Sequence, residues 1–298
     1  WMIEQAHQRG FEFHAWLNPY RATFDTKIET LSEEHDYFKH KDWMIKYGET
    51  GKEKYYYNPA LPEVKSHLTA VVEEVVQNYD IDAIHFDDYF YPYKVTGKVF
   101  NDSASFKKYG NKLSLEDWRR DNVNTFVKNI YYTIKRHKPW VQFGISPFGV
   151  WRNKSVDPKG SDTQSGQTNY DDLYADPIAW MEGKYIDYML PQLYWSIDHK
   201  TASYSKLLKW WADNSTNTNV YIGNGSYNKE GNSYHFSFKK TVSEQIRYIV
   251  IYSAEGNSKI DCNDSSQIIE KIYINPKTDS IKLLLSKDQL HNKNKVAF

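Results

Sequence analysis

The sequence contains a single cysteine, no long apolar run and no excess of charge of either sign, and each shortage excludes a class of protein. Cys262 is the only cysteine in 298 residues, so no internal disulfide framework exists, and nothing beside it marks a nucleophile. No apolar run approaches the roughly 18 residues that a membrane-spanning helix needs. Lys and Arg number 38, as do Asp and Glu, and this zero formal net charge argues against a nucleic-acid or anionic-membrane partner.

Several catalytic and binding motifs are also missing. A G-x-S-x-G elbow is absent, which excludes a serine hydrolase of that type. Asn224-Gly225-Ser226 follows an expected strand but lacks the spacing of a phosphate-binding loop. No His, Cys and Asp spacing matches a metal site, and no secretory signal is recognisable after Trp1. We therefore expect no metal and no other cofactor, and chemistry carried out by side chains alone.

Aromatic residues are abundant instead. They make up 16% of the chain, as ten Trp, 25 Tyr and 14 Phe. Extra Tyr and Trp can simply fill a core, but many of these rings stand beside Pro, Asn, Asp and Gln at the ends of expected strands. Rings in such positions are typical of carbohydrate-binding platforms.

Residues 81–93 combine a short apolar run with a pair of acids. Ile81 to Phe86 has the pattern of a buried parallel strand, and it is followed directly by Asp87, Asp88 and a group of aromatics that ends at Pro92. The ordinary interpretation of Asp-Asp at this point is a turn after a strand. A buried strand that presents acids among rings at its C-terminal end also suits a sugar-cleaving barrel.

Expected strands and helices alternate along the chain. The expected strands cover 11–17, 81–86, 141–147, 186–195, 220–225 and, more weakly, 248–253, and the expected helices cover 62–80, 116–137, 170–182 and 203–213. Residues 22–59 are expected to form a long aromatic excursion that faces the substrate. This alternation predicts an α/β fold, a TIM (β/α)8-type barrel in one domain over 1–298. A closed barrel has eight strands, so two βα units are expected to be missing from the front.

Four separated phrases resemble the glycosyl hydrolase-like 10 family. They are His14–Arg21, His85–Pro92, Gly144–Arg152 and Asp187–Trp195, and the resemblance covers about residues 1 to 230, while 231–298 matches poorly. The family pattern has two strands before the first phrase, in agreement with the strand count. The resemblance implies a TIM barrel that acts on the glycan strands of bacterial peptidoglycan. It also implies a location in the bacterial cell envelope or outside the cell.

Asp87 and Asp88 are the candidate catalytic residues. Glycosidic bond cleavage generally uses two carboxyl groups, one protonated and one ionised. Strand alternation places Asp87 on the same face as His85, whereas the Asp-Tyr-Phe context of Asp88 resembles nucleophile sites of other barrel glycosidases. We expect a working pair in which one carboxyl acts and the other orients it.

The second carboxyl stays open among several candidates. Asp157, Asp162, Asp171 and Asp172 lie in or after the loop behind the third phrase, where the ordinary interpretation is loop solvation and helix capping. Asp187 stands at the start of its strand, which is the wrong rim of a barrel. The acetamido group of the substrate is a further alternative.

The candidate substrate-binding residues close the same strands. They are His14, Trp16, Asn18, Arg21, His85, Tyr91, Trp151, Arg152, Gln192, Tyr194 and Trp195. Arg21 fits a clamp for a carboxylate or a donor to sugar hydroxyls, or else a salt bridge that fixes the rim. The aromatic members are stacking candidates, of which some will belong to the core, and the histidines fit a hydrogen-bonded core better than a metal site. The expected partner is a polysaccharide or oligosaccharide substrate, and a non-catalytic carbohydrate-binding barrel or an inactive fragment are the alternatives to a glycoside hydrolase.

Overall fold

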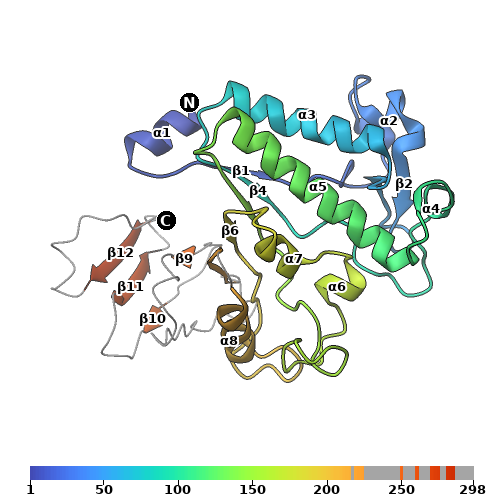
Figure 1. The fold of residues 1–298 in the computed structure, drawn as a ribbon. Coiled ribbons are helices and arrows are strands. Elements are labelled where there is room, and N and C mark those ends of the chain that lie inside the picture. The colour runs from blue at the N-terminus through green and yellow to red at the C-terminus, as the bar shows by residue number, and fades with distance from the viewer. Residues whose placement is uncertain (216–217, 225–248, 251–258, 262–268, 276–279, 286–298) are drawn as a thin grey trace.

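A computed structural model describes residues 1–215 and 218–224, followed by short strands of which only the backbone is described (Figure 1). The helices are α1 (Met2–Gln8), α2 (Asp36–Lys39), α3 (Pro62–Asn78), α4 (Ser103–Tyr109), α5 (Leu115–His137), α6 (Asn169–Asp172), α7 (Pro177–Glu182) and α8 (Tyr204–Asn214). The strands are β1 (His14–Leu17), β2 (Met44–Tyr47), β3 (Lys54–Tyr57), β4 (Ala83–Phe86), β5 (Gln142–Ile145), β6 (Tyr188–Met189), β7 (Asn219–Val220), β8 (Ile222–Gly223), β9 (Ile249–Val250), β10 (Lys259–Asp261), β11 (Ile269–Asn275) and β12 (Ser280–Leu285). Cys262, Gly225, Ser226 and most of the weak strand expected over 248–253 lie outside the described residues.

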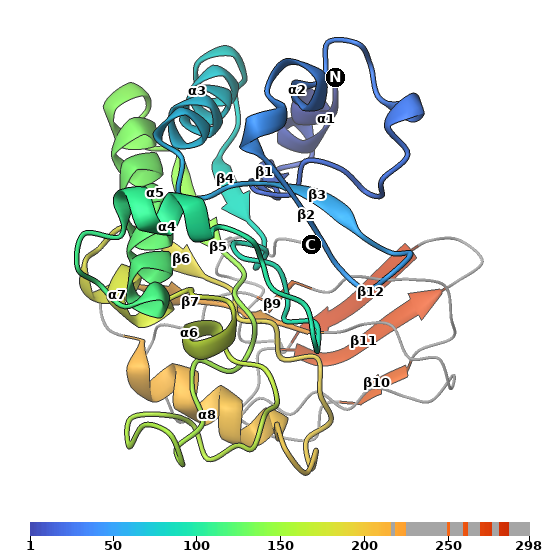
Figure 2. The same cartoon turned by 90° about the vertical axis from the view of Figure 1, so that its right-hand side faces the viewer.

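A parallel sheet organises the described part of the chain. Its order is β1-β4-β5-β6-β7, so neighbouring strands follow one another along the chain without a reversal. Right-handed crossovers then place the connecting helices on one face, and Figures 1 and 2 show α3 and α5 packed side by side over the first strands. This order is that of a singly wound α/β sheet and differs from a doubly wound one, in which the order reverses at a switch point.

The buried core lies between the sheet and these helices. Ile84 and Phe86 alternate with His85 along β4, so they point to the helical face. The Phe86 ring stacks on Phe126 of α5 with ring centroids 5.9 Å apart, and it meets Phe143 of β5 edge-on. All six apolar positions predicted for the inner side of α5 are buried, namely Trp118, Val123, Phe126, Val127, Ile130 and Ile134. The helical period in the sequence therefore identified the packed face correctly.

Several expected elements differ from the structure, among them the strand expected over 220–225, which is divided into β7 and β8. The helix predicted over 170–182 is two helices, α6 and α7, because Pro177 begins α7 and the Asp176 side chain accepts a hydrogen bond from the Ala179 amide as its N-cap. The strand predicted over 186–195 pairs only at Tyr188–Met189. Residues 22–59 contain a β2–β3 hairpin, and α4 was not predicted.

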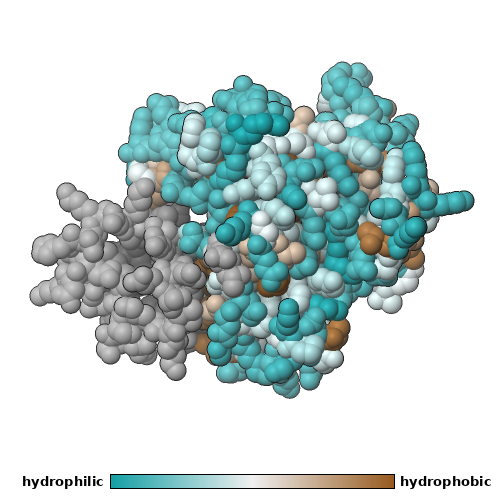
Figure 3. Space-filling view, in the orientation of Figure 1, coloured by the Kyte–Doolittle hydropathy of each residue, from teal (hydrophilic) through white to brown (hydrophobic). Residues whose placement is uncertain are grey.

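The surface of the described part is mostly hydrophilic, with small separate hydrophobic patches on the face shown in Figure 3. Among the described helices, none has the length and apolar character needed to cross a membrane. Neighbouring residues across the sheet share a face, and the register places Trp16 beside His85 and His85 beside Gly144. The loops that follow β1, β4, β5 and β6 thus leave the sheet at one rim.

Candidate active site

Asp87 and Asp88 lie at this rim, directly after β4, in different surroundings. Asp87 is half-buried, and its backbone amide donates to the Leu17 carbonyl 3.1 Å away, which continues the pairing of β4 with β1. Asp88 is only 2% exposed. Its backbone amide donates to Asp87 Oδ1 at 2.8 Å, and the two carboxyl groups lie close enough to affect each other's protonation.

The surroundings of Asp88 favour its protonated form. Burial raises the pKa of the Asp88 carboxyl to about 7, a hydrogen bond from the Tyr93 hydroxyl to Oδ2 works against that rise, and the neighbouring charge of Asp87 adds to it. Near neutral pH the pair can therefore hold one proton, with Asp88 as its site. One protonated and one ionised carboxyl is the state that glycosidic bond cleavage requires.

Gln192 connects Asp87 to the neighbouring strands. Its Nε2 donates to Asp87 Oδ1 at 3.0 Å and to the Ser146 carbonyl at 2.9 Å. Gln192 follows β6 and Ser146 follows β5, so three strand ends meet at this carboxylate. The structure thus brings together two residues that were predicted from separate phrases, Asp87 and Gln192, and it fixes the orientation of the Asp87 side chain.

A layer of hydrogen-bonded side chains lies beneath the acid pair. Tyr188 reaches across Gly144, and its hydroxyl lies 2.9 Å from His85 Nδ1 and 3.0 Å from His14 Nδ1. His85 Nε2 lies 3.0 Å from Ser146 Oγ. Burial lowers the pKa of His85 to about 4, and the nearby His14 contributes to the decrease, so the His85 imidazole is neutral near pH 7. Across the described residues, no group of three or more His, Cys, Asp or Glu side chains is placed to hold a metal ion.

Arg21, Trp16 and Asn18 line the rim beside β1. The Arg21 guanidinium lies 4.6 Å from the Phe24 ring centroid and 5.6 Å from that of Tyr89, and within the described part of the chain no carboxylate forms an ion pair with it. Trp16 is 53% exposed. The amide oxygen and nitrogen of Asn18 are buried, and neither has a hydrogen-bond partner among the described residues.

The predicted stacking roles of Tyr91 and Trp151 are wrong. Tyr91 is 1% exposed and packs edge-on against Phe100 and Tyr174. Trp151 is 6% exposed and stacks on Trp210 of α8, with ring centroids 5.8 Å apart. Both rings complete the core under the rim, where no sugar can reach their faces.

The other two predicted aromatics remain at the surface. Tyr194 is 45% exposed and Trp195 is half-buried. The Trp195 ring meets Phe148 edge-on at 5.3 Å, which ties the loop after β6 to the loop after β5. Tyr194, Trp195 and Trp16 are therefore the predicted stacking residues that keep exposed ring area.

Arg152, a predicted substrate contact, has its guanidinium paired with carboxylates of the protein. It donates to both carboxylate oxygens of Asp171, at 3.0 and 2.8 Å, and to Asp157 at 2.8 Å. The Arg152 side chain is 18% exposed and lies over the Tyr170 ring. This cluster fixes the long loop after β5.

The candidates for the second catalytic carboxyl form ion pairs within the protein. Asp157 and Asp171 are held by Arg152, Asp172 forms an ion pair with Lys94 at 2.7 Å, and Asp162 forms one with Lys206 at 2.6 Å. Asp187 pairs with Lys135 and accepts from the Phe143 amide at the start of the strands, as its position predicted. Each Asp considered for this role thus has a structural partner.

Three residues at the site were missed by sequence reasoning. Tyr93 contacts Asp88, while Tyr188 and Ser146 build the layer below. All three lie inside the recognised phrases or one residue beyond them. Tyr188 precedes Gln192 by four residues, so strand alternation places both side chains on one face, and this signal was available in the sequence.

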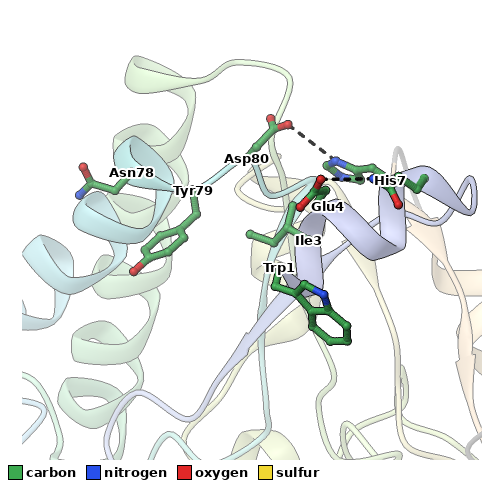
Figure 4. Close-up of a pocket in the computed structure, with 8 residues that line it drawn as sticks. Trp1, Ile3, Glu4, His7, Asn78, Tyr79 and Asp80 are labelled. Atoms are coloured by element: carbon green, nitrogen blue, oxygen red, sulfur yellow. Dashed lines mark hydrogen bonds and ion pairs between the residues drawn. The ribbon is translucent and has the colours of Figure 1, made fainter.

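A shallow hollow lies at the other end of the sheet. It is lined by Trp1, Ile3, Glu4, His7 and Gln8 from the first helix and by Asn78, Tyr79 and Asp80 from the segment that enters β4 (Figure 4). His7 lies 2.8 Å from an Asp82 carboxylate oxygen that also accepts the Phe13 amide, which ties α1 to the beginnings of β1 and β4. Active sites of α/β barrels lie at the opposite rim, where β4 ends.

Comparisons with known proteins gave one family match and several curated relatives. A family model described as Glycosyl hydrolase-like 10 matches residues 1–240. Glycosyl hydrolase YngK of Bacillus subtilis is 50% identical over 236 residues, which covers 78% of this chain and 46% of that protein. Glycosyl hydrolase DigH of Escherichia coli is 42% identical over 238 residues, which covers 76% of this chain and 53% of that protein. The chain thus spans about half the length of these relatives.

Solved structures give a weaker likeness. A cycloisomaltooligosaccharide glucanotransferase of Paenibacillus sp., crystallised with cycloisomaltoheptaose, has 14% sequence identity and a TM-score of 0.45, over 78% of this chain and 29% of that one. Ega3 of Aspergillus fumigatus, crystallised with galactosamine, has 9% identity and a TM-score of 0.39, over 78% of this chain and 69% of that one.

Proposed function

This chain belongs to the glycosyl hydrolase-like 10 family, and from that premise we propose that it is a glycoside hydrolase that cleaves a bacterial cell-wall glycan of the peptidoglycan type. One observation carries the proposal. Two adjacent carboxyls at the C-terminal end of β4 lie in unlike surroundings, Asp87 half-exposed and hydrogen-bonded to Gln192, Asp88 buried with a raised pKa. The relatives are named as glycosyl hydrolases, and the cell-wall substrate follows from the resemblance of the four phrases.

The barrel architecture is part of the same proposal. The five strands of the sheet follow one another in order, and within the described residues β1 has no strand partner on its other side. We propose that this sheet is one portion of an eight-stranded (β/α) barrel in which two strands precede β1. In such a barrel Trp16, His85 and Tyr188 face the interior, in agreement with their shared side of the sheet.

The geometry assigns different roles to the two acids. Asp87 is the carboxylate that faces the substrate and stabilises the positive charge that develops at the anomeric carbon, because Asp88 is too buried to touch a sugar ring. Gln192 holds Asp87 in place, and Asp88 keeps a proton beside it. Trp16 and Tyr194 offer exposed ring faces for the sugar, and Arg21 offers a cation without an acidic partner in the described part of the chain.

The test measures the release of reducing ends from peptide-free peptidoglycan strands. We expect product from the parent chain, a loss of about 10³-fold in Asp87→Asn, and little change in Asp162→Asn, whose carboxylate is exposed and paired with Lys206. Asp88→Asn is expected to lose activity as well, because its proton is missing. Product that survives in both Asp87→Asn and Asp88→Asn would contradict the assignment of this strand end.

Binding without product would favour a different function. A parent chain that melts cooperatively, binds the glycan and releases no reducing ends would be a carbohydrate-binding protein. A location in the cell envelope or outside the cell belongs to the proposal, because the proposed substrate is found there. Fractionation of cells that express the full-length protein measures that location directly.

A further inference from the structure

The proposed reaction needs a group that protonates the leaving oxygen, and the carboxyls considered for it are occupied. Asp157, Asp162, Asp171 and Asp172 form ion pairs with Arg or Lys side chains. Asp88 retains a proton, yet at 2% exposure its own oxygens cannot contact a substrate. The proton on Asp88 therefore needs a route to the surface.

Tyr93 contacts this carboxyl directly. Its hydroxyl forms a hydrogen bond with Asp88 Oδ2, and its ring is half-buried in the loop after β4. The ring meets Tyr89 edge-on at 5.3 Å and Phe148 edge-on at 6.2 Å. Since Phe148 belongs to the loop after β5, Tyr93 is held between two strand ends and its hydroxyl stays over the buried carboxyl.

We propose that Tyr93 is a catalytic residue that donates the proton to the glycosidic oxygen, with Asp88 behind it as the proton source. The inference rests on the proposed glycoside hydrolase function and supplies the acid that this function lacks. A protonated Asp88 donates to the Tyr93 oxygen, which turns the tyrosine proton outward to the substrate. The buried carboxyl acts through the tyrosine and does not contact the sugar.

The protons and electrons balance in this step. The bond between the anomeric carbon and the glycosidic oxygen breaks, and its electron pair stays on the oxygen. That oxygen takes the Tyr93 proton, Tyr93 takes the Asp88 proton, and Asp88 becomes a carboxylate while Asp87 stabilises the anomeric carbon. Water then supplies hydroxide to the anomeric carbon, and its remaining proton returns to the carboxyl pair.

The charges around Asp88 are consistent with this role. Asp87 precedes it, the Tyr93 hydroxyl bonds to it, and Tyr89 lies near both acids with the Arg21 guanidinium 5.6 Å from its ring centroid. Burial raises the pKa of Tyr93, so its hydroxyl carries a proton at neutral pH and loses it only as the Asp88 proton replaces it. No cation forms an ion pair with Asp88 among the described residues.

The experiment compares two substrates that differ only in the leaving group. One is the peptide-free glycan, whose leaving sugar oxygen needs a proton, and the other is an aryl glycoside of the same sugar whose phenol leaves without one. In Tyr93→Phe we expect a loss of kcat of about 10²- to 10⁴-fold on the glycan and less than about tenfold on the aryl glycoside. Tyr132→Phe, which removes an exposed hydroxyl from α5, is the matched control and should change neither rate.

The pH dependence adds a second readout. With the glycan, kcat of the parent should fall as the pH rises past the Asp88 pKa of about 7, because the proton source is lost, and with the aryl glycoside this decrease should be absent. Asp88→Asn should show the same dependence on leaving group as Tyr93→Phe. Equal losses on both substrates in Tyr93→Phe would overturn the proposal and leave hydrolysis standing, whereas a folded parent that cleaves neither substrate would overturn both.

Discussion

Asp87 and Asp88 are adjacent in the sequence, but their different burial and hydrogen-bond partners give them different chemical roles. Asp87 lies at the rim and accepts a hydrogen bond from Gln192, while Asp88 is buried and accepts one from Tyr93. Removing a carboxyl from water disfavours its charged form, and the Asp87 charge next to it adds to that effect. The protonation state of Asp88 is therefore a property of its burial.

The raised pKa of Asp88 predicts a dependence of stability on pH. An unfolded Asp has a pKa of about 3.9, so the stabilisation by the extra proton is complete below that value and is lost as the pH rises to the folded pKa of about 7. Between these limits the parent should lose about 4 kcal/mol of unfolding free energy through this group. Denaturant unfolding at pH 4.5 and pH 8 measures the difference for the parent and for Asp88→Asn.

The comparison with the variant isolates this one group. His85 has a lowered pKa and acts in the opposite direction, but it is present in both proteins and cancels. Asp88→Asn should therefore change its unfolding free energy less than the parent does between the two pH values. Equal changes in both proteins would show that the buried carboxyl does not bind the extra proton.

At the scale of elements, strand β5 needs a glycine at position 144, because a ring of the next strand packs there. A Cβ atom on Gly144 would lie 2.0 Å from the Tyr188 ring, so the ring of the next strand lies directly over this glycine. From there the Tyr188 hydroxyl reaches His85 on β4 and His14 on β1. Gly144 thus allows a tyrosine of β6 to reach across β5 and form hydrogen bonds with side chains of β4 and β1.

Gly144→Ala is expected to destabilise the protein strongly. The added methyl group overlaps a ring atom at a distance that no small shift relieves, and overpacking of a close-packed layer costs about 1 to 3 kcal/mol or more. Gly166→Ala is the matched control, since nothing lies within 4 Å of its Cβ position. Thermal unfolding followed by circular dichroism should show a lower Tm for Gly144→Ala alone, and an equal Tm in both variants would contradict the packing of Tyr188.

At the scale of the whole molecule, a buried ion pair joins segments that are distant in the sequence. Arg119 of α5 donates to both oxygens of Asp102, at 2.8 and 2.6 Å, as well as to the Phe100 carbonyl and the Tyr174 hydroxyl. The side chains of Arg119 and Asp102 are 7% and 2% exposed. The loops after β4 and β5 are therefore attached to the same helix behind the site.

Removal of one partner should leave an uncompensated buried charge. We expect Asp102→Asn to lower the free energy of unfolding by about 3 to 5 kcal/mol. Asp162→Asn breaks an exposed pair with Lys206 and should cost no more than about 1 kcal/mol. Urea unfolding of the three proteins provides the measurement, and equal midpoints for the two variants would show that the buried pair is not needed to hold these loops.

The sequence predicted the helices and the strand order better than it predicted which aromatic side chains are buried. The helical period marked the buried positions of α5, and the acids after β4 marked the rim. The aromatic phrases did not separate Trp16, which is exposed, from Trp151 and Tyr91, which are core. A ring beside Pro or Asp has the same local pattern in both cases, and only the segments packed against it determine whether its face is covered.

The sequence by itself determined the alternation of strands and helices, the family, and the presence of paired carboxyls at a strand end, because these depend on local spacing and on residue type. Only the tertiary structure decided which carboxyl is buried, that Arg152 is occupied by Asp171 and Asp157, and that Tyr93 covers Asp88. Burial and pairing depend on residues far apart in the chain. Since desolvation and neighbouring charge set the pKa values, the chemistry of the site is decided by packing that no local pattern contains.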